Sequence, residues 1–171
     1  GAATSLLDLP GRPSGTDVEL EALLGGSGRA GFVFDHYNAT DYKFVALDRS
    51  AGTVSIGHVI RGRLVIDSLI AVTLPARDVR VTLKLSGTTV EVRVGGVLVG
   101  SFSYSGPVLD GAMGALVAAG TASFDDVRTF IGTRLVNAVD AVAPVLTVPG
   151  DVVVAVPEGQ TAVVVPEWQL G

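Results

Sequence analysis

Side chains able to bind a ligand are most concentrated in one stretch of the chain, from Gly31 to His58. This stretch contains both histidines and two of the three tyrosines. Aromatic rings can stack on a sugar ring, while carboxylate and amide groups can hydrogen-bond its hydroxyls or hold a cation. The predicted ligand-binding residues are His36, Tyr37, Asn38, Asp41, Tyr42 and His58.

These residues also have a purely structural interpretation. Asp and Asn are common in turns, so residues 35–41 could form a solvated turn without any ligand. His58 lies on the same face of a predicted strand as Val54 and Ile56, where a histidine is more often a hydrogen-bonded core residue. If that face instead binds a ligand, His58 would contact it together with Tyr42.

No catalytic constellation is found elsewhere in the sequence. The absence of cysteine excludes disulfides and thiolate metal sites. Two histidines that lie far apart in the sequence are weak evidence for zinc. The glycine-rich segment 25–28 is followed by neither Lys-Ser nor Lys-Thr, so it is not a phosphate-binding loop. The sequence therefore predicts no enzyme activity.

The composition narrows the class of protein further. Hydrophobic residues make up 48% of the chain and charged residues 17%, and 22 residues are glycine. Short runs of Val, Thr and Ser between glycines indicate an all-β protein with many turns. A formal net charge of −5 argues against a nucleic-acid partner. No apolar run approaches the roughly 18 residues of a membrane span.

Alternating apolar and polar residues predict about nine or ten short strands between residues 5 and 131, which indicates a sandwich or barrel. In residues 42–48, Tyr42 and Phe44 share one face, and Val45 and Leu47 share the other. Gly95-Gly96 predicts a two-residue hairpin turn. Residues 113–118 and 123–130 are predicted to form the last two of these strands.

The composition changes after Ile131. Residues 132–143 are predicted to be a linker that could carry one helical turn before Pro144. Residues 144–171 form a tail with three β-prone runs, too few to bury a core alone. This tail would pack on the main domain, belong to a second domain, or add to a neighbouring copy. The predicted assembly residues are Val152, Val153, Val154, Val163, Val164 and Val165.

Several segments together resemble the laminin-G-like, concanavalin-type jelly roll of bacterial secreted and surface proteins. They are AGFVFDHYNATDYKFVALD, TVSIGH, VRVTLKLSGTTVEVRVGGVLVGSFSY and LDGAMGALVAAGTASFDDVRTF. The resemblance implies a jelly-roll β-sandwich over residues 1–131. The tail segment APVLTVPGDVVVAVPEGQTAVVVPEW resembles the opening strands of an immunoglobulin-like hyalin repeat. Neither resemblance implies an enzyme.

Jelly-roll modules of this kind sometimes hold a structural Ca²⁺ near the two ends of the chain. Ca²⁺ needs several oxygen ligands. The candidate ligands that the resemblance implies are Asp17, Glu19, Asp125 and Asp126. The alternative is that one of the last two aspartates caps a turn and the other is solvated. No other cofactor is expected.

The function expected from these observations is that of a non-catalytic extracellular module of a bacterial surface or secreted protein. It would serve glycan binding, adhesion or spacing, with a glycan or adjacent modules as partners. One alternative is a fibre or sheath subunit whose C-terminal strands add to a neighbouring copy. Another is an accessory module of a polysaccharide-degrading enzyme.

Overall fold

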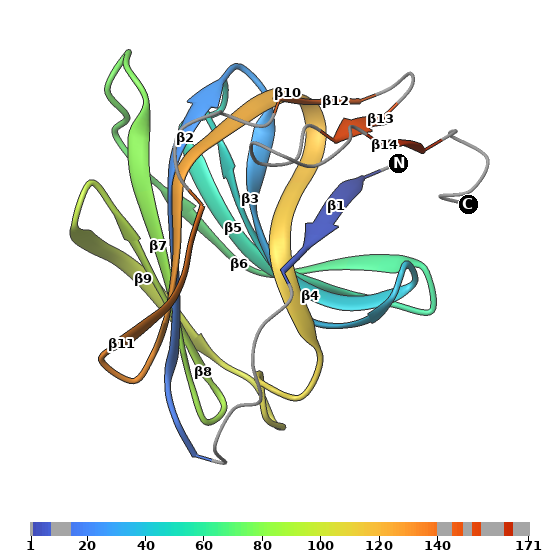
Figure 1. The fold of residues 1–171 in the computed structure, drawn as a ribbon, viewed down its shortest axis with the longest axis vertical. Helices are drawn as coiled ribbons and strands as arrows, with labels where there is room; N and C mark the ends of the chain where they lie inside the picture. The colour runs from blue at the N-terminus through green and yellow to red at the C-terminus, as the bar shows by residue number, and fades with distance from the viewer. Residues whose placement is uncertain (1, 8–14, 140–144, 149–151, 155–162, 166–171) are drawn as a thin grey trace.

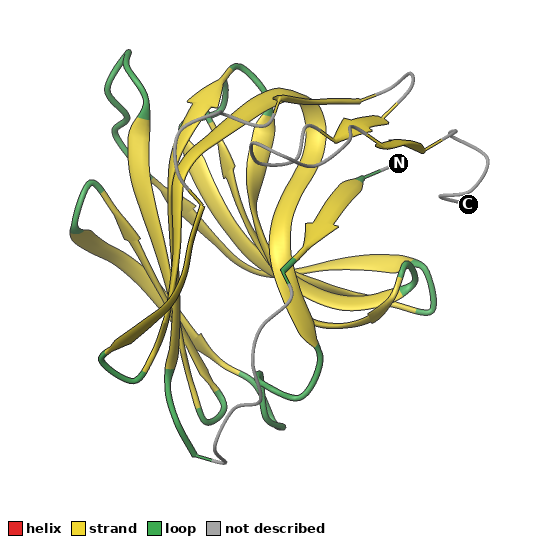
Figure 2. Cartoon of the chain, viewed as in Figure 1, coloured by secondary structure: helices red, strands yellow, loops and turns green. Residues whose placement is uncertain are grey.

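The computed structural model describes residues 2–7, 15–139, 145–148, 152–154 and 163–165. In these residues all regular secondary structure is β-strand, and no helix occurs (Figure 2). The strands form an antiparallel jelly-roll β-sandwich, so the predicted fold class is confirmed. The described part of the chain has no helix long and apolar enough to cross a membrane.

Two sheets face one another across the core (Figure 1). Sheet A has six strands in this order: β6 (Arg63–Ala71), β5 (Thr53–Ile60), β4 (Asp41–Asp48), β3 (Arg29–Asn38), β10 (Ala112–Ile131) and β1 (Ala3–Leu6). Sheet B runs from β9 (Val97–Ser103) through β8 (Thr89–Val94), β7 (Val79–Ser86) and β2 (Val18–Gly26) to the second part of β10. The Gly95-Gly96 turn joins β8 to β9 with φ values of 60° and 83°, which confirms the predicted hairpin.

Strand β10 belongs to both sheets and arches between them (Figure 1). Residues 113–118 and 123–130 were predicted as two strands, and this prediction was wrong, because one strand of 20 residues contains both. Gly120 lies between the two parts with a φ of 71°, in the left-handed region that glycine adopts without strain. The chain therefore changes direction here while the neighbouring strands stay paired.

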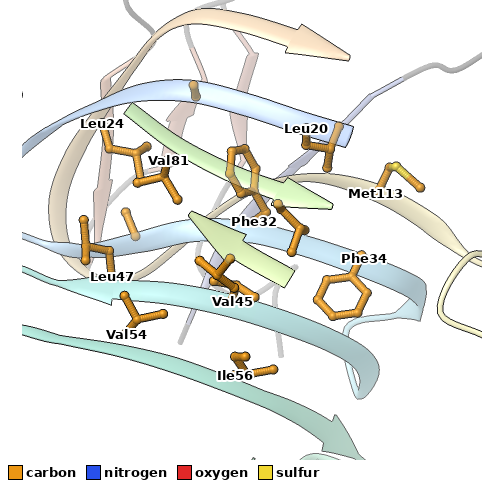
Figure 3. Packing of buried hydrophobic residues seen from close by; sticks show 14 of the residues in the cluster. Leu20, Leu24, Phe32, Phe34, Val45, Leu47, Val54, Ile56, Val81 and Met113 are labelled. Carbon is orange, nitrogen blue, oxygen red and sulfur yellow. The ribbon is translucent and has the colours of Figure 1, made fainter. Parts of the chain in front are cut away.

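The main core lies between the two sheets. Phe32, Val45 and Ile56 project from sheet A towards Leu20 and Val81 of sheet B (Figure 3). All five side chains are almost fully buried, and burying each contributes about 1.5–3 kcal/mol. The prediction that Val45 and Leu47 share one face is confirmed, and that face is the core-facing one.

Strand β11 (Arg134–Val139) lies within the predicted linker and pairs with the end of β10. The expectation of a helical turn in this segment is therefore wrong for residues 134–139. β2 and β11 both pair with this end of β10, so the adjoining segment extends sheet B.

The tail contributes three further short strands. β12 (Val145–Val148) pairs with residues 120–123 of β10, so it extends sheet B. β13 (Val152–Val154) and β14 (Val163–Val165) pair with each other as a separate two-stranded sheet. Of the three placements considered for the tail, the structure shows packing on the main domain for β12.

Candidate functional site

A groove with a volume of about 390 Å³ lies on the face of sheet A that points away from the main core. All six strands of this sheet contribute to its lining. The groove-lining residues used below are Thr4, Arg29, His36, Tyr42, Phe44 and Ser55. The volume is in the lower part of the range of about 300–1,000 Å³ that is typical of small-molecule sites.

The floor of the groove is hollow because glycines occupy outward-facing positions of sheet A. Gly57 lies opposite Phe44 on the neighbouring strand, and the Phe44 ring covers it. A Cβ added to Gly57 would lie 2.8 Å from Cζ of Phe44. Gly31 faces the same way two residues before Val33, where a side chain would meet the backbone of β4. A second apolar cluster of Val33, Phe44, Ala46 and Leu116 surrounds these glycines.

Two aromatic side chains predicted as ligand contacts meet at one end of the groove. The rings of His36 and Tyr42 stack with centroids 5.7 Å apart and an interplanar angle of 28°. Burial lowers the pKa of His36, so its imidazole is neutral at pH 7 and can both donate and accept a hydrogen bond. Burial also raises the pKa of Tyr42, which therefore stays a phenol. The pair offers a flat surface with polar edges.

Asp35 determines which side chain of β3 faces the groove. It lies in an irregular part of the β3–β4 pairing, with a φ of 48° that few residues other than glycine adopt. Its side chain is buried and forms an ion pair with Lys43. Its Oδ1 accepts hydrogen bonds from the Tyr37 hydroxyl at 2.9 Å and the Gly111 amide at 3.0 Å. With Asp35 held inside, His36 lines the groove instead.

Raising the pH above about 10 is expected to destabilise the protein through its tyrosines. The hydrogen bond from Tyr37 to Asp35 is the main cause that raises the pKa of Tyr37 to about 12. An unfolded chain loses the tyrosine proton near pH 10, so between about pH 10 and 12 the folded state binds more protons and stability falls as pH rises. Burial raises the pKa of Tyr104 as well, which acts in the same direction.

This expectation can be checked with urea unfolding midpoints at about pH 8, 10 and 11, a series that spans the start of the window. The same series with Tyr37→Phe should show a smaller fall, because the variant has no hydroxyl at that position to titrate. A midpoint that does not change over this range would contradict the assignment.

His58 lies on the opposite face of sheet A from Tyr42, so the prediction that both contact one ligand is wrong. The cross-strand partner of His58 is Lys43, whereas Tyr42 lies opposite Val59. Nδ1 of His58 lies 2.7 Å from Oδ2 of Asp67, and the Tyr104 hydroxyl donates to the same Oδ2 at 3.1 Å. The structure therefore agrees with the alternative interpretation, in which His58 is a hydrogen-bonded histidine on the core-facing side of the sheet.

The other residues of the predicted ligand-binding turn serve the turn itself. Oδ1 of Asn38 accepts hydrogen bonds from the Thr40 amide and hydroxyl, both at 2.8 Å, which closes the β3–β4 hairpin. Asp41 is the backbone partner of Asn38 across this hairpin. The Tyr37 ring is largely exposed and does not line the groove. His36 and Tyr42 are thus the predicted residues that the groove brings together.

The structure does not bring the four candidate calcium ligands together. Among the described residues, no three His, Cys, Asp or Glu side chains are grouped so that they could hold a metal ion. Asp126 pairs with both Arg80 and Arg128, and the Arg80 hydrogen bond is the main cause that lowers its pKa. Asp17 lies 3.3 Å from Lys84, and Asp125 accepts the amide of Asp126. Glu19 lies opposite Lys84 in the β2–β7 pairing.

The six predicted assembly residues all lie in β13 and β14. Val152, Val153 and Val154 pair with Val165, Val164 and Val163 of the same chain. Each strand therefore has one edge paired within the chain. Addition to a neighbouring copy stays a prediction.

Three polar groove residues were not singled out from the sequence: Thr4, Arg29 and Ser55. The cross-strand pairing places Ser55 and Thr4 in one row with Gly31, two residues along β3 from Arg29. Ser55 donates a hydrogen bond to the Ala46 carbonyl at 3.2 Å, which leaves its oxygen able to accept another. Ser55 could have been noticed, because it alternates with Val54 and Ile56 and so faces away from the core.

No protein-family model and no curated protein sequence matches this chain. Among solved structures, the carbohydrate-binding module CBM66 from Bacillus subtilis matches with a TM-score of 0.60 and 16% identity, over 75% of this chain and 94% of that one. A galectin, LEC-6 from Caenorhabditis elegans, matches with a TM-score of 0.48 and 14% identity, over 67% of this chain and 85% of the galectin. Sheep galectin-11, in complex with glycerol, matches with a TM-score of 0.48 and 13% identity, over 76% of this chain and 96% of the galectin.

At 16% identity the comparison with the Bacillus subtilis module establishes the fold alone. The chain has a jelly-roll β-sandwich fold that is similar to that of the Bacillus subtilis module. The closer resemblance to laminin-G-like modules, and that of the tail to a hyalin repeat, stay predictions. Much of the tail lies outside the described residues.

Proposed function

We propose that this chain is a non-catalytic glycan-binding module of a bacterial secreted or surface protein, and that the sheet A groove holds the glycan. The observation that carries the proposal is the stacked pair of His36 and Tyr42 within the groove. A sugar ring presents apolar C–H groups on its faces and hydroxyls around its edge. An aromatic surface flanked by polar groups matches both.

Further support comes from the rest of the lining and from the fold. Ser55 and Thr4 add hydroxyls farther along the groove, and Phe44 adds an apolar floor between the two ends. The similar Bacillus subtilis structure is that of a carbohydrate-binding module. An accessory module of a polysaccharide-degrading enzyme would bind through the same groove. That alternative therefore differs in the attached domain and not in the site.

The proposal is tested by comparing the wild-type protein with Tyr42→Ala on an array of immobilised neutral and acidic oligosaccharides. The best ligand is then measured by calorimetry. Loss of the stacked surface is expected to weaken binding by about tenfold or more, since about 1.4 kcal/mol corresponds to that factor. Val97→Ala is the control, because Val97 is an exposed apolar residue of sheet B that lies outside the groove. The proposal fails if wild type binds no glycan, or if Tyr42→Ala binds as well as wild type.

A further inference from the structure

We propose that the groove selects acidic oligosaccharides, whose carboxylate or sulfate group pairs with Arg29 while another ring of the same oligosaccharide stacks on His36 and Tyr42. This inference rests on the proposed function, because it assumes that a glycan occupies the groove. It adds the class of glycan, which the aromatic pair does not specify. The groove has an anion-binding end and a ring-stacking end.

Arg29 carries the only permanent charge among the described residues that line the groove. The other lining side chains are aliphatic, aromatic or hydroxyl groups, together with the neutral imidazole of His36. No carboxylate is among them, although acidic residues outnumber basic ones in the whole chain by 17 to 12. An anionic ligand would therefore meet a positive charge in the groove and no opposing negative one.

The guanidinium of Arg29 also has no hydrogen-bond or ion-pair partner among the described residues. It forms no hydrogen bond with their side chains or carbonyls and no ion pair within 4.0 Å. The nearest acidic side chain in the pairing register is Asp48, directly across on β4. Asp48 already accepts hydrogen bonds from the Ala51 amide at 2.9 Å and the Ser50 hydroxyl at 2.8 Å. These two hydrogen bonds are the main causes that lower the pKa of Asp48, and the charge of Arg29 is the smallest of the causes.

The planar guanidinium suits the ligand proposed for it. Arginine donates two parallel hydrogen bonds to a carboxylate or to a sulfate, and such charge-assisted pairs are stronger than neutral hydrogen bonds. Arg29 is half-buried, so its charge is less screened by solvent than that of a fully exposed arginine. A neutral sugar hydroxyl would gain much less from the same position.

The length of the groove requires an oligosaccharide. Arg29 and Tyr42 lie in cross-strand rows that are separated by the rows of Gly31 and Val33. Adjacent rows on one face are two residues apart, so the two ends are separated by about 20 Å. One sugar ring cannot reach both, and a chain of several units can. The hydroxyls of Ser55 and Thr4 lie between the two ends, where they can bond the intervening units.

The inference is tested by calorimetry with four soluble probes. They are a galacturonic acid tetramer, its methyl ester, a sulfated galactan oligosaccharide and an unsulfated one. The ester keeps the rings and removes the charge. We expect the acid or the sulfated probe to bind about tenfold or more tightly than its neutral counterpart. Arg29→Gln should abolish this preference without weakening the binding of the neutral probe. Arg93→Gln on sheet B, a half-buried arginine outside the groove, should leave the preference unchanged.

The outcomes separate this inference from the proposed function. Equal binding of the charged and neutral probes, or a preference that survives Arg29→Gln, overturns the selection of acidic glycans and leaves the glycan-binding function standing. A preference lost equally in Arg93→Gln points to the overall charge of the protein and also overturns it. Binding of no probe, together with no binding on the oligosaccharide array, overturns both proposals.

Discussion

Asp35→Ala is expected to lower the free energy of unfolding by about 3 kcal/mol, at the lower end of the cost of breaking a buried ion pair. The Asp35 side chain is 1% exposed and that of Lys43 is 20% exposed. Removing the carboxylate leaves the Lys43 ammonium without its counter-charge. The hydroxyl of Tyr37 and the amide of Gly111 also lose their bonds to Oδ1. Lys43 keeps its place 5.2 Å from the centroid of the Tyr104 ring, which limits the loss.

Urea unfolding of three variants measures this effect. Asp35→Asn should lie between alanine and wild type, because an amide oxygen can still accept the two hydrogen bonds while the charge is gone. Asp110→Asn is the matched control, an exposed aspartate whose replacement should change stability by less than about 0.5 kcal/mol. If Asp35→Ala matches this control, the buried pair does not contribute to the stability of the β3–β4 hairpin.

Gly31→Ala is expected to destabilise the protein by about 3 kcal/mol, because the added methyl group has no space. Its Cβ would lie 2.2 Å from the carbonyl oxygen of Val45 and 3.1 Å from Cα of Ala46. Both are backbone atoms in the middle of sheet A, so no change of side-chain rotamer relieves the contact. The sheet itself would have to widen between β3 and β4.

Gly106→Ala is the matched control for this substitution, and its expected effect has the opposite sign. Nothing lies within 4 Å of the Cβ position at Gly106, and its φ is outside the left-handed region. Alanine should therefore stabilise the protein by about 0.4–1 kcal/mol, through the lower entropy of the unfolded chain. Thermal unfolding of both variants beside the wild type tests the pair. A neutral Gly31→Ala would show that sheet A tolerates a wider spacing at this point.

Composition and alternation along the chain predicted an all-β sandwich or barrel and the two faces of several strands, and the family resemblance narrowed the fold to a jelly roll. The pattern of residues 42–48 predicts two opposite faces, and the structure shows that Val45 and Leu47 pack in the main core while Phe44 and Ala46 pack on the outer face. Alternation is a local pattern in the sequence, so it predicts the two faces of a strand but not which strands pair with each other. The continuity of β10 across Gly120 depends on pairing with β2, β3 and three other strands, so it could not be read from the pattern.

The candidate site was predicted only in part, for a related reason. His36 and Tyr42 were named for their chemistry, and the structure places both in the groove. The positive φ of Asp35 changes the alternation of β3, and only this change turns His36 outward. Arg29 lies seven residues before His36 in the sequence, and no local motif connects the two. The register of β3, β4 and β5 is what makes them opposite ends of one surface.

The pairing of β1 and β12 with the same strand has a mechanical consequence. Ala3, where β1 begins, lies opposite Val117 of β10, and Val148, where β12 ends, lies opposite Gly120. A pulling force applied at these two points would therefore act across a short distance along one strand. It would load the hydrogen bonds of two four-residue strands, while the sandwich behind them would bear little tension.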